Sequence, residues 1–298
     1  MKTDPKLSEA FAVMVVLGLF MPSLSRGVEG AEGITAVASK VSNDYVRTKL
    51  PDGSFQVETY AFGNGGNWGG PFPDDTIDKL GFLEIARVIA TPLASQNYIS
   101  AKDPNKTELL IMVYWGTTTT PDKASFSPAY IDYQSLMQET NLTSDPGVKA
   151  GLLDSALMLA EMANRQRDHL DYKNAAMLGY DSVGLIGTEW GDAIKLTALK
   201  RTHDDYTAEI EANRYFVVLM AYDFQMMWKQ KKHKLLWETR FSINQPRNDF
   251  GKALPVMAAT ASKYFGQESH GLVRQVIPAG HVEIHEPTLI ELLEGSKK

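Results

Sequence analysis

The most restrictive feature of the chain is a run of seven apolar and aromatic residues from Leu109 to Trp115. A strand with one face in water alternates apolar and polar side chains, whereas a strand covered on both faces is apolar throughout. A run of this length suits a strand and is short for a helix. It therefore predicts a central strand that is covered on both sides.

Other segments have the patterns of further strands. Residues 34–62 are predicted to form strands, and their second half alternates apolar and polar side chains, as a half-buried strand does. Residues 215–228 and 235–243 are predicted to be two strands joined by a charged turn at 229–234. Beyond Gly271 the chain carries the segment 272–277, for which no secondary structure is predicted.

Three segments show helical periodicity. The first begins near residue 74, where two aspartates offer N-caps, and is expected to be disrupted at Pro92. The longest spans 148–178 and has Gly179 as its C-cap. The last helix is expected at 249–265.

The order of these elements predicts an α+β fold, a two-layer sheet with packed helices. The sheet domain is discontinuous, formed by residues 32–118 and 214–298, and a mainly helical insertion occupies 119–213. Residues 117–148, rich in threonine and proline, are expected to be mostly loop.

Residues 1–31 have the order of an export signal. Two lysines precede an apolar run at 10–21, and small residues follow it, so cleavage is expected within 25–31. The run is shorter than the roughly 20 residues that span a bilayer. The sequence has no cysteine, so neither a lipid anchor on cysteine nor a disulfide can form. We predict a periplasmic or secreted protein without a transmembrane segment after signal removal.

The formal net charge of −6 argues against nucleic acid and anionic lipid as partners. No cysteine nucleophile and no Gly-x-Ser-x-Gly elbow is present, which removes the usual support for a nucleophilic hydrolase. No cofactor motif is present either, and we expect no cofactor.

Four short motifs resemble those of a bacterial cell-envelope domain family of unknown function, whose members are often lipoproteins. The motifs are Thr59-Tyr60, Leu109 to Trp115, Tyr222-Asp223 and Leu236 to Arg240. The resemblance covers residues 40–118 and 214–266 and implies a fold and an envelope location, without implying a chemistry. This chain departs from the family in lacking the lipobox cysteine and in carrying the long insertion.

One cluster near the carboxyl end has metal-ligand chemistry. In a strand His281, Glu283 and His285 would share one face, and two imidazoles with a carboxylate suit zinc or iron. Alternating polar residues on an exposed edge strand explain the pattern equally well.

The glycine-rich segment 63–70 lies between a predicted strand and a predicted helix. It lacks the residues of a phosphate-binding loop, so we expect a mobile surface loop. Trp68 within it either stacks on a sugar ring or a partner's side chain, or folds down over the sheet. Thr117 and Thr118 end the central strand, where they either contact a ligand or extend an edge strand.

The leading functional prediction is an exported, non-enzymatic protein that binds an unidentified envelope macromolecule or small ligand. The first alternative is a metal-assisted hydrolase that uses His281, Glu283 and His285. The second is a carbohydrate-binding protein that uses Trp68.

Overall fold

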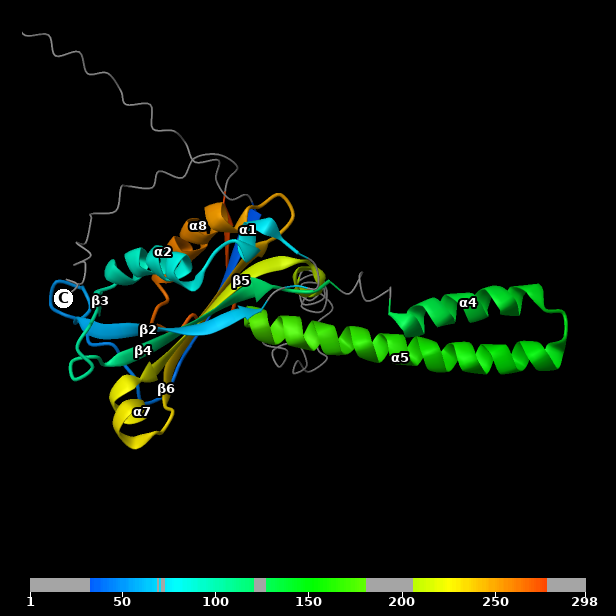
Figure 1. The fold of residues 1–298 in the computed structure, drawn as a ribbon, viewed down its shortest axis with the longest axis horizontal. Coiled ribbons are helices and arrows are strands. Elements are labelled where there is room, and N and C mark those ends of the chain that lie inside the picture. The colour runs from blue at the N-terminus through cyan, green and yellow to red at the C-terminus, as the bar shows by residue number, and fades with distance from the viewer. Residues whose placement is uncertain (1–32, 69, 71–72, 121–126, 181–205, 278–298) are drawn as a thin grey trace, which may run out of the picture.

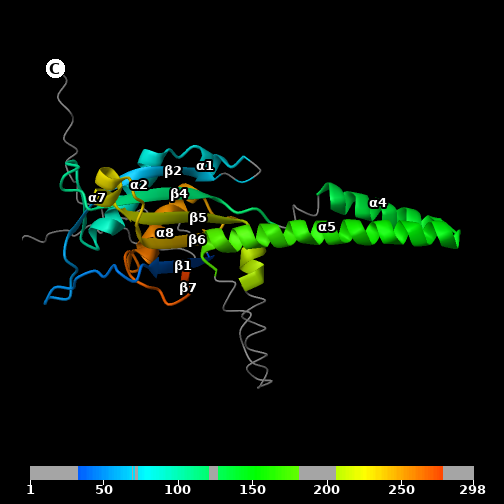
Figure 2. The same cartoon turned by 90° about the horizontal axis from the view of Figure 1, so that it is seen from below.

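The computed structural model describes residues 33–68, 70, 73–120, 127–180 and 206–277. Within these residues, seven strands form one mixed sheet in the order β3-β2-β4-β5-β6-β1-β7 (Figures 1 and 2). β2 is parallel to both β3 and β4, and the other pairs are antiparallel. The strands are β1 (Gly33–Val41), β2 (Glu58–Trp68), β3 (Tyr98–Ser100), β4 (Leu109–Thr117), β5 (Arg214–Asp223), β6 (Leu235–Asn244) and β7 (Val273–Ile277).

Helices α1, α2 and α8 lie together on one side of the sheet (Figure 1). Asp74 caps α1 by accepting from the Thr76 N–H, and Asp249 caps α8 by accepting from the Lys252 N–H, so both predicted caps are confirmed. The single helix predicted from residue 74 is wrong, because α1 ends at Asp78 and α2 begins anew at Phe82. The helices are α1 (Asp75–Asp78), α2 (Phe82–Ala94), α4 (Pro128–Leu142), α5 (Pro146–Leu178), α7 (Phe224–Gln230) and α8 (Phe250–Ser262).

The main core lies between the sheet and the pair α2 and α8. Ile85 and Ile89 of α2 and Met257 of α8 are fully buried, with Ile111 and Val113 of β4 in the same cluster. The α+β class is therefore confirmed. The expected break at Pro92 is wrong, because α2 continues through it to Ala94. Pro92 stands in the last turn of the helix, where its missing N–H removes one backbone hydrogen bond near an end that frays anyway.

The other side of the sheet, here called the open face, is covered only in part. Along β4, Ile111 and Val113 are buried on the core side, whereas Met112 and Tyr114 on the open face are half-buried. The expectation that this strand is covered on both sides is thus met on one side only. The end of α5 covers part of the open face, where Leu178 packs with residues of β5.

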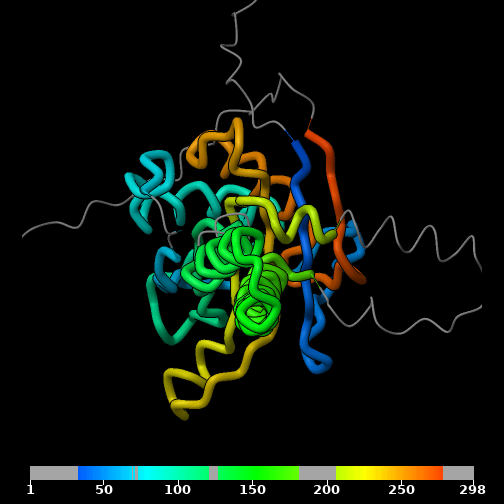
Figure 3. Tube along the Cα trace, turned by 90° about the vertical axis from the view of Figure 1, so that its right-hand side faces the viewer, coloured from blue at the N-terminus to red at the C-terminus, as the bar shows by residue number. Residues whose placement is uncertain are grey.

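The expected loop at 117–148 is wrong, because residues 128–142 form α4. Ser127 caps this helix and Pro128 occupies its first position, where proline favours a helix start. α4 turns back onto α5, and the two helices form a hairpin that projects from the sheet domain (Figure 1); Figure 3 shows it nearly end-on. α5 ends at Gly179 with φ 79°, as predicted.

The segment 224–228, expected to continue a strand, is also helical. β5 ends at Asp223, whose side chain accepts from the Met226 N–H and caps α7. This cap gives the chain a local alternative to the strand ladder. In the described part of the chain, no helix combines the length and apolar character needed to cross a membrane.

Candidate functional site

Residues 63–68, expected to be a mobile loop, are the second half of β2. The β2–β4 register shifts by one residue between Asn64 and Gly66, which is a β-bulge at Gly65. Gly66 has φ 109°, a conformation that side chains other than glycine's rarely adopt. A bulge re-aims the side chains that follow it. Here it sets Trp68 beside Gly116 on the open face.

Trp68 lies on the open face with about half of its surface exposed, 52%. Its ring meets Tyr114 edge to face at a centroid distance of 6.4 Å. The backbone approaches closely at this point, since a Cβ on Gly116 would stand 2.0 Å from the Trp68 carbonyl oxygen. The indole therefore contacts the sheet through Tyr114 and leaves the rest of its surface exposed to solvent. The sequence suggested either an exposed, ligand-stacking Trp68 or one folded over the sheet, and the observed arrangement lies between these.

Thr117 and Thr118 do not join Trp68 in one site. Thr118 is buried, and its hydroxyl donates to the Ala212 carbonyl at 3.0 Å and accepts from the Arg214 N–H at 2.9 Å. Thr117 pairs with Tyr215, on the core side of the sheet opposite to Trp68. These contacts give Thr118 a structural role and leave Trp68 as the exposed member of the three.

The proposed metal ligands His281, Glu283 and His285 lie outside the described residues. Within the part of the chain that the structure describes, no group of three histidine, aspartate or glutamate side chains is placed to hold a metal ion.

The α4–α5 hairpin is fixed to the sheet by polar and close-packed contacts at the end of α5. The buried side-chain amide of Asn174 donates to the Thr119 carbonyl at 2.8 Å. Arg240 of β6 donates to the Ala176 carbonyl at 2.6 Å and places a cation at the negative end of the helix. Gly179 passes so close to β1 that a Cβ there would lie 2.6 Å from the Ala38 Cβ.

The outer half of the hairpin exposes apolar side chains beyond those that join its two helices. Small residues such as Ala129 and Ala156 are buried between the helices. The exposed apolar side chains of the hairpin, called here the hairpin patch, are Tyr130, Ile131, Leu142, Val148, Leu153, Leu157, Met158 and Met162. A shallow hollow beside Tyr130 and Gln134 is lined by α4 alone. The apolar stripe over 148–178 predicted that Leu153 and Leu157 pack inward, and the loop expected at 117–148 concealed α4, so the sequence did not reveal this surface.

Acidic residues outnumber basic ones along the outer hairpin, although Arg165, just beyond it, lies 3.9 Å from Glu161. Between residues 128 and 163 the single basic side chain is Lys149, and all the charged residues there are exposed. The acidic residues are Asp132, Glu139, Asp145, Asp154 and Glu161. The outer hairpin thus combines an apolar surface with negative charge.

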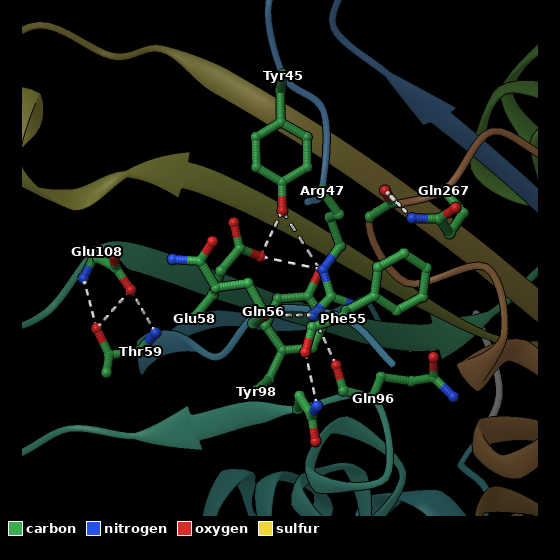
Figure 4. Close-up of polar contacts among 12 residues, drawn as sticks. Tyr45, Arg47, Phe55, Gln56, Glu58, Thr59, Gln96, Tyr98, Glu108 and Gln267 are labelled. Atoms are coloured by element: carbon green, nitrogen blue, oxygen red, sulfur yellow. Dashed lines mark hydrogen bonds and ion pairs between the residues drawn. The ribbon is translucent and has the colours of Figure 1, made fainter. Parts of the chain in front are cut away.

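A largely buried ionic cluster lies where β2 begins (Figure 4). The Arg47 guanidinium lies between the rings of Phe55 and Tyr98, at 4.3 and 4.0 Å from their centroids. Its Nε stands 3.2 Å from Glu58 Oε2, which also accepts a hydrogen bond of 2.7 Å from the Tyr45 hydroxyl. The cluster ties the irregular segment after β1 to β2.

Burial dominates the electrostatics of this cluster. It raises the pKa of Glu58 above its ordinary value, although the Tyr45 hydroxyl and Arg47 favour the ionised carboxylate. Burial also raises the pKa of Tyr45 and of Tyr98. A perturbed carboxyl group can mark a catalytic site. Here the Arg47 side chain is almost fully buried, and its Nη2 donates to the Gln96 carbonyl at 2.6 Å, so the arrangement is that of a structural clamp.

Comparison with known proteins yields little. No family model matches the sequence, and no curated protein matches it. Among solved structures, the chain is similar to a PDZ domain protein from Parabacteroides distasonis ATCC 8503, with 12% identity and a TM-score of 0.36. The match covers 83% of this chain and 40% of that one, so this chain matches less than half the length of that protein.

Proposed function

We propose that this chain is an exported, non-enzymatic binding protein of the bacterial envelope or secreted fraction, and that the α4–α5 hairpin is its contact arm. The observation that carries the proposal is the hairpin patch. Eight apolar side chains are exposed on this one pair of helices, and exposed apolar surface concentrated in this way often marks a site that meets a partner. A projecting pair of helices presents that surface clear of the sheet domain (Figure 1).

The way α5 is anchored supports the role of the hairpin as a binding element with a fixed position. Asn174, Arg240 and Gly179 hold the last turns of α5 against strands of the sheet and its flanking segments. A binding element whose position is fixed in advance loses less freedom when its partner binds. The hairpin is therefore suited to present one preformed surface.

The charge around the hairpin patch indicates the chemistry of the partner. Its rim holds five acidic side chains and one lysine between residues 128 and 163. Complementary potentials favour association, and like charges oppose it. We infer a protein partner whose apolar surface is bordered by lysine or arginine. The acidic rim disfavours an anionic lipid surface.

The test compares two variants of the same helix. The variant Leu157→Gln, Met158→Gln, Met162→Gln removes apolar surface from the hairpin patch, whereas Tyr172→Gln changes an exposed side chain nearer the sheet domain. Each purified full-length protein is immobilised and incubated with an envelope extract of the native host. We expect the wild type and Tyr172→Gln to retain the same protein, and the triple variant to lose it.

Salt provides a second measurement in the same assay. Retention by the wild type should fall as ionic strength rises, because screening weakens the contacts of the acidic rim. All three proteins should keep the same unfolding midpoint, since the replaced side chains are exposed. Equal retention by the folded triple variant would refute the contact-arm role.

Export is tested separately. Mass spectrometry of the protein from its native host should find an amino terminus created within residues 25–31. An intact Met1 on cytosolic protein would contradict export and leave the hairpin experiment unaffected.

Carbohydrate binding through Trp68 is the second candidate, favoured by the half-exposed indole beside Tyr114. Aromatic rings of this kind stack on the apolar faces of sugars. Titration with envelope glycans should then change the tryptophan fluorescence of the wild type and leave that of Trp68→Phe unchanged. An unchanged wild-type signal across the glycans would argue against this function.

A further inference from the structure

The outer edge of β2 has backbone groups without a partner among the described residues. β3 pairs with Glu58–Tyr60 only, while β2 continues to Trp68. No hydrogen bond of the described residues reaches the outer edge of residues 61–68. Unpaired edges of this kind are templates for another strand.

The contacts at the start of β2 show which of its residues direct their backbone N–H and C=O groups away from β4. The Glu58 N–H donates at 3.1 Å, and the Tyr60 carbonyl accepts at 2.8 Å, both toward the side of β3. Backbone groups of alternate residues point the same way, so Phe62 and Asn64 also point outward. The bulge after Asn64 moves the next outward residue to Asn67.

Apart from the bulge at Gly65, this edge lacks the features that protect edge strands. Native edges carry lysine, other charges or proline, which prevent pairing with a further strand. Residues 61–68 contain no charged residue and no proline, and Asn64 is exposed. The opposite edge, β7, differs because it carries Arg274.

We propose that β2 pairs antiparallel with β2 of a second copy of this chain. A strand edge meets itself under two-fold symmetry when the copies run antiparallel, and each then supplies the donors that the other accepts. If the two-fold axis passes between Asn64 and Gly65, Phe62 of one copy lies opposite Asn67 of the other, and both residues direct their backbone groups outward. Trp68 then lies beside Ala61 of the second copy. The absence of charge on residues 61–68 removes the repulsion that normally prevents such pairing.

The experiment measures the mass of the full-length chain by analytical ultracentrifugation over a range of concentrations. Asn64→Pro removes an outward N–H from each copy and leaves the β2–β4 ladder intact, because proline is accepted where the N–H faces away from the sheet. We expect the wild type to dimerise and Asn64→Pro to weaken the dimer by roughly tenfold or more. Asn64→Lys should also weaken it, and added salt should restore it in part, because the new charges lie near the axis.

Val276 supplies the matched control on the opposite edge. The Ser39 N–H of β1 points toward the β7 side, so β1 faces Val273 and Gln275, and Val276 points its N–H outward. Val276→Pro and Val276→Lys should leave the dimer unchanged. A wild type that stays monomeric, or a dimer that both folded Asn64 variants retain, would overturn the proposal. Loss of the dimer in the Val276 variants alone would place the contact on the other edge and overturn it as well.

Discussion

Arg47→Met tests whether the cluster of Figure 4 is held by its buried ion pair. Arg47 lies between two rings, and its Nε stands 3.2 Å from Glu58, whose side chain is 22% exposed. Removing one partner of a buried pair costs about 3–5 kcal/mol. The partial exposure of Glu58 places the cost at the lower end of this range. We expect the free energy of unfolding to fall by about 3 kcal/mol near neutral pH.

The loss of unfolding free energy in Arg47→Met should depend on pH. The direction of this dependence follows from the pKa of Glu58. Burial raises the pKa of this carboxyl group in the folded state, and removal of Arg47 raises it further because a neighbouring cation is lost. The folded variant therefore holds its proton more tightly than the unfolded chain does. The stability that this proton contributes is present below the unfolded value of about 4.3 and is lost as the pH rises through the folded pKa.

The assay is urea unfolding of wild type, Arg47→Met, Glu58→Gln and the double variant at about pH 4 and about pH 8, on either side of the ordinary carboxyl pKa. The loss in Arg47→Met should be larger at the higher pH by roughly 2 kcal/mol, since an unpaired buried charge exists only there. The double-mutant cycle at that pH should give a coupling of about 2 kcal/mol. A loss independent of pH, with a coupling below about 0.5 kcal/mol, would refute the ion-pair explanation.

Three further substitutions test other parts of the fold. Burial alone would raise the pKa of Asp74, but hydrogen bonds led by that from Tyr215 lower it below its ordinary value. Tyr215→Phe should therefore cost about 1 kcal/mol at neutral pH, a cost that shrinks on titration below about pH 4 as Asp74 takes up its proton. Gly179→Ala should cost more than about 1 kcal/mol, because φ is positive and Ala38 is close, and hydrogen exchange should rise in the last turns of α5. Arg214→Met should cost about 3 kcal/mol in urea unfolding, because it takes a fully buried cation away from Glu209, 3.6 Å distant, and from the Ser242 hydroxyl.

Local periodicity predicted the elements whose burial follows one simple pattern. The run that begins at Leu109 became β4 in the middle of the sheet, and the stripe over 148–178 became α5 with its cap at Gly179. The caps of α1 and α8 were predictable because an aspartate precedes each helix. These features depend on residues close together in the sequence.

The wrong predictions, of loops at 117–148 and 63–70, arose at residues that occur both in loops and in regular structure. Pro128 is one of the prolines that favour a loop over 117–148, although a serine before a proline is also a signal for a helix start. The glycines of 63–66 indicated a loop, whereas they accommodate a bulge and leave room for Met112 and Tyr114. The bulge depends on the pairing of β2 with β4, which lies far along the chain, so the glycines alone could not indicate it.

The ionic cluster could not be predicted from sequence because its members come from separate elements. Arg47 and Glu58 are 11 residues apart across an irregular segment, and Tyr98 belongs to a strand that pairs with β2. A buried arginine has no periodicity that distinguishes it from an exposed one. Only tertiary structure brings the two rings and the carboxylate around it.

The bulge at Gly65 makes a last prediction, because two neighbouring deletions should have opposite results. Deleting Gly65 removes the extra residue and leaves every later β2–β4 pair, including that of Trp68 with Gly116, in register. Deleting Asn67 moves Trp68 into the position opposite Trp115, on the core side, since a shift of one residue reverses the face.

Deletion of Gly65 should therefore change the free energy of unfolding by less than about 1 kcal/mol and keep the quenching of Trp68 by acrylamide, measured against Trp68→Phe. Deletion of Asn67 should cost about 1 kcal/mol or more, because Trp68 loses its contact with Tyr114 and takes the exposed position that Asn67 held. Only the deletion of Asn67 shortens the connection after β2, because deletion of Gly65 leaves the later pairs where they were. If the two deletions destabilised the protein equally, the bulge would not be what directs Trp68 to the open face.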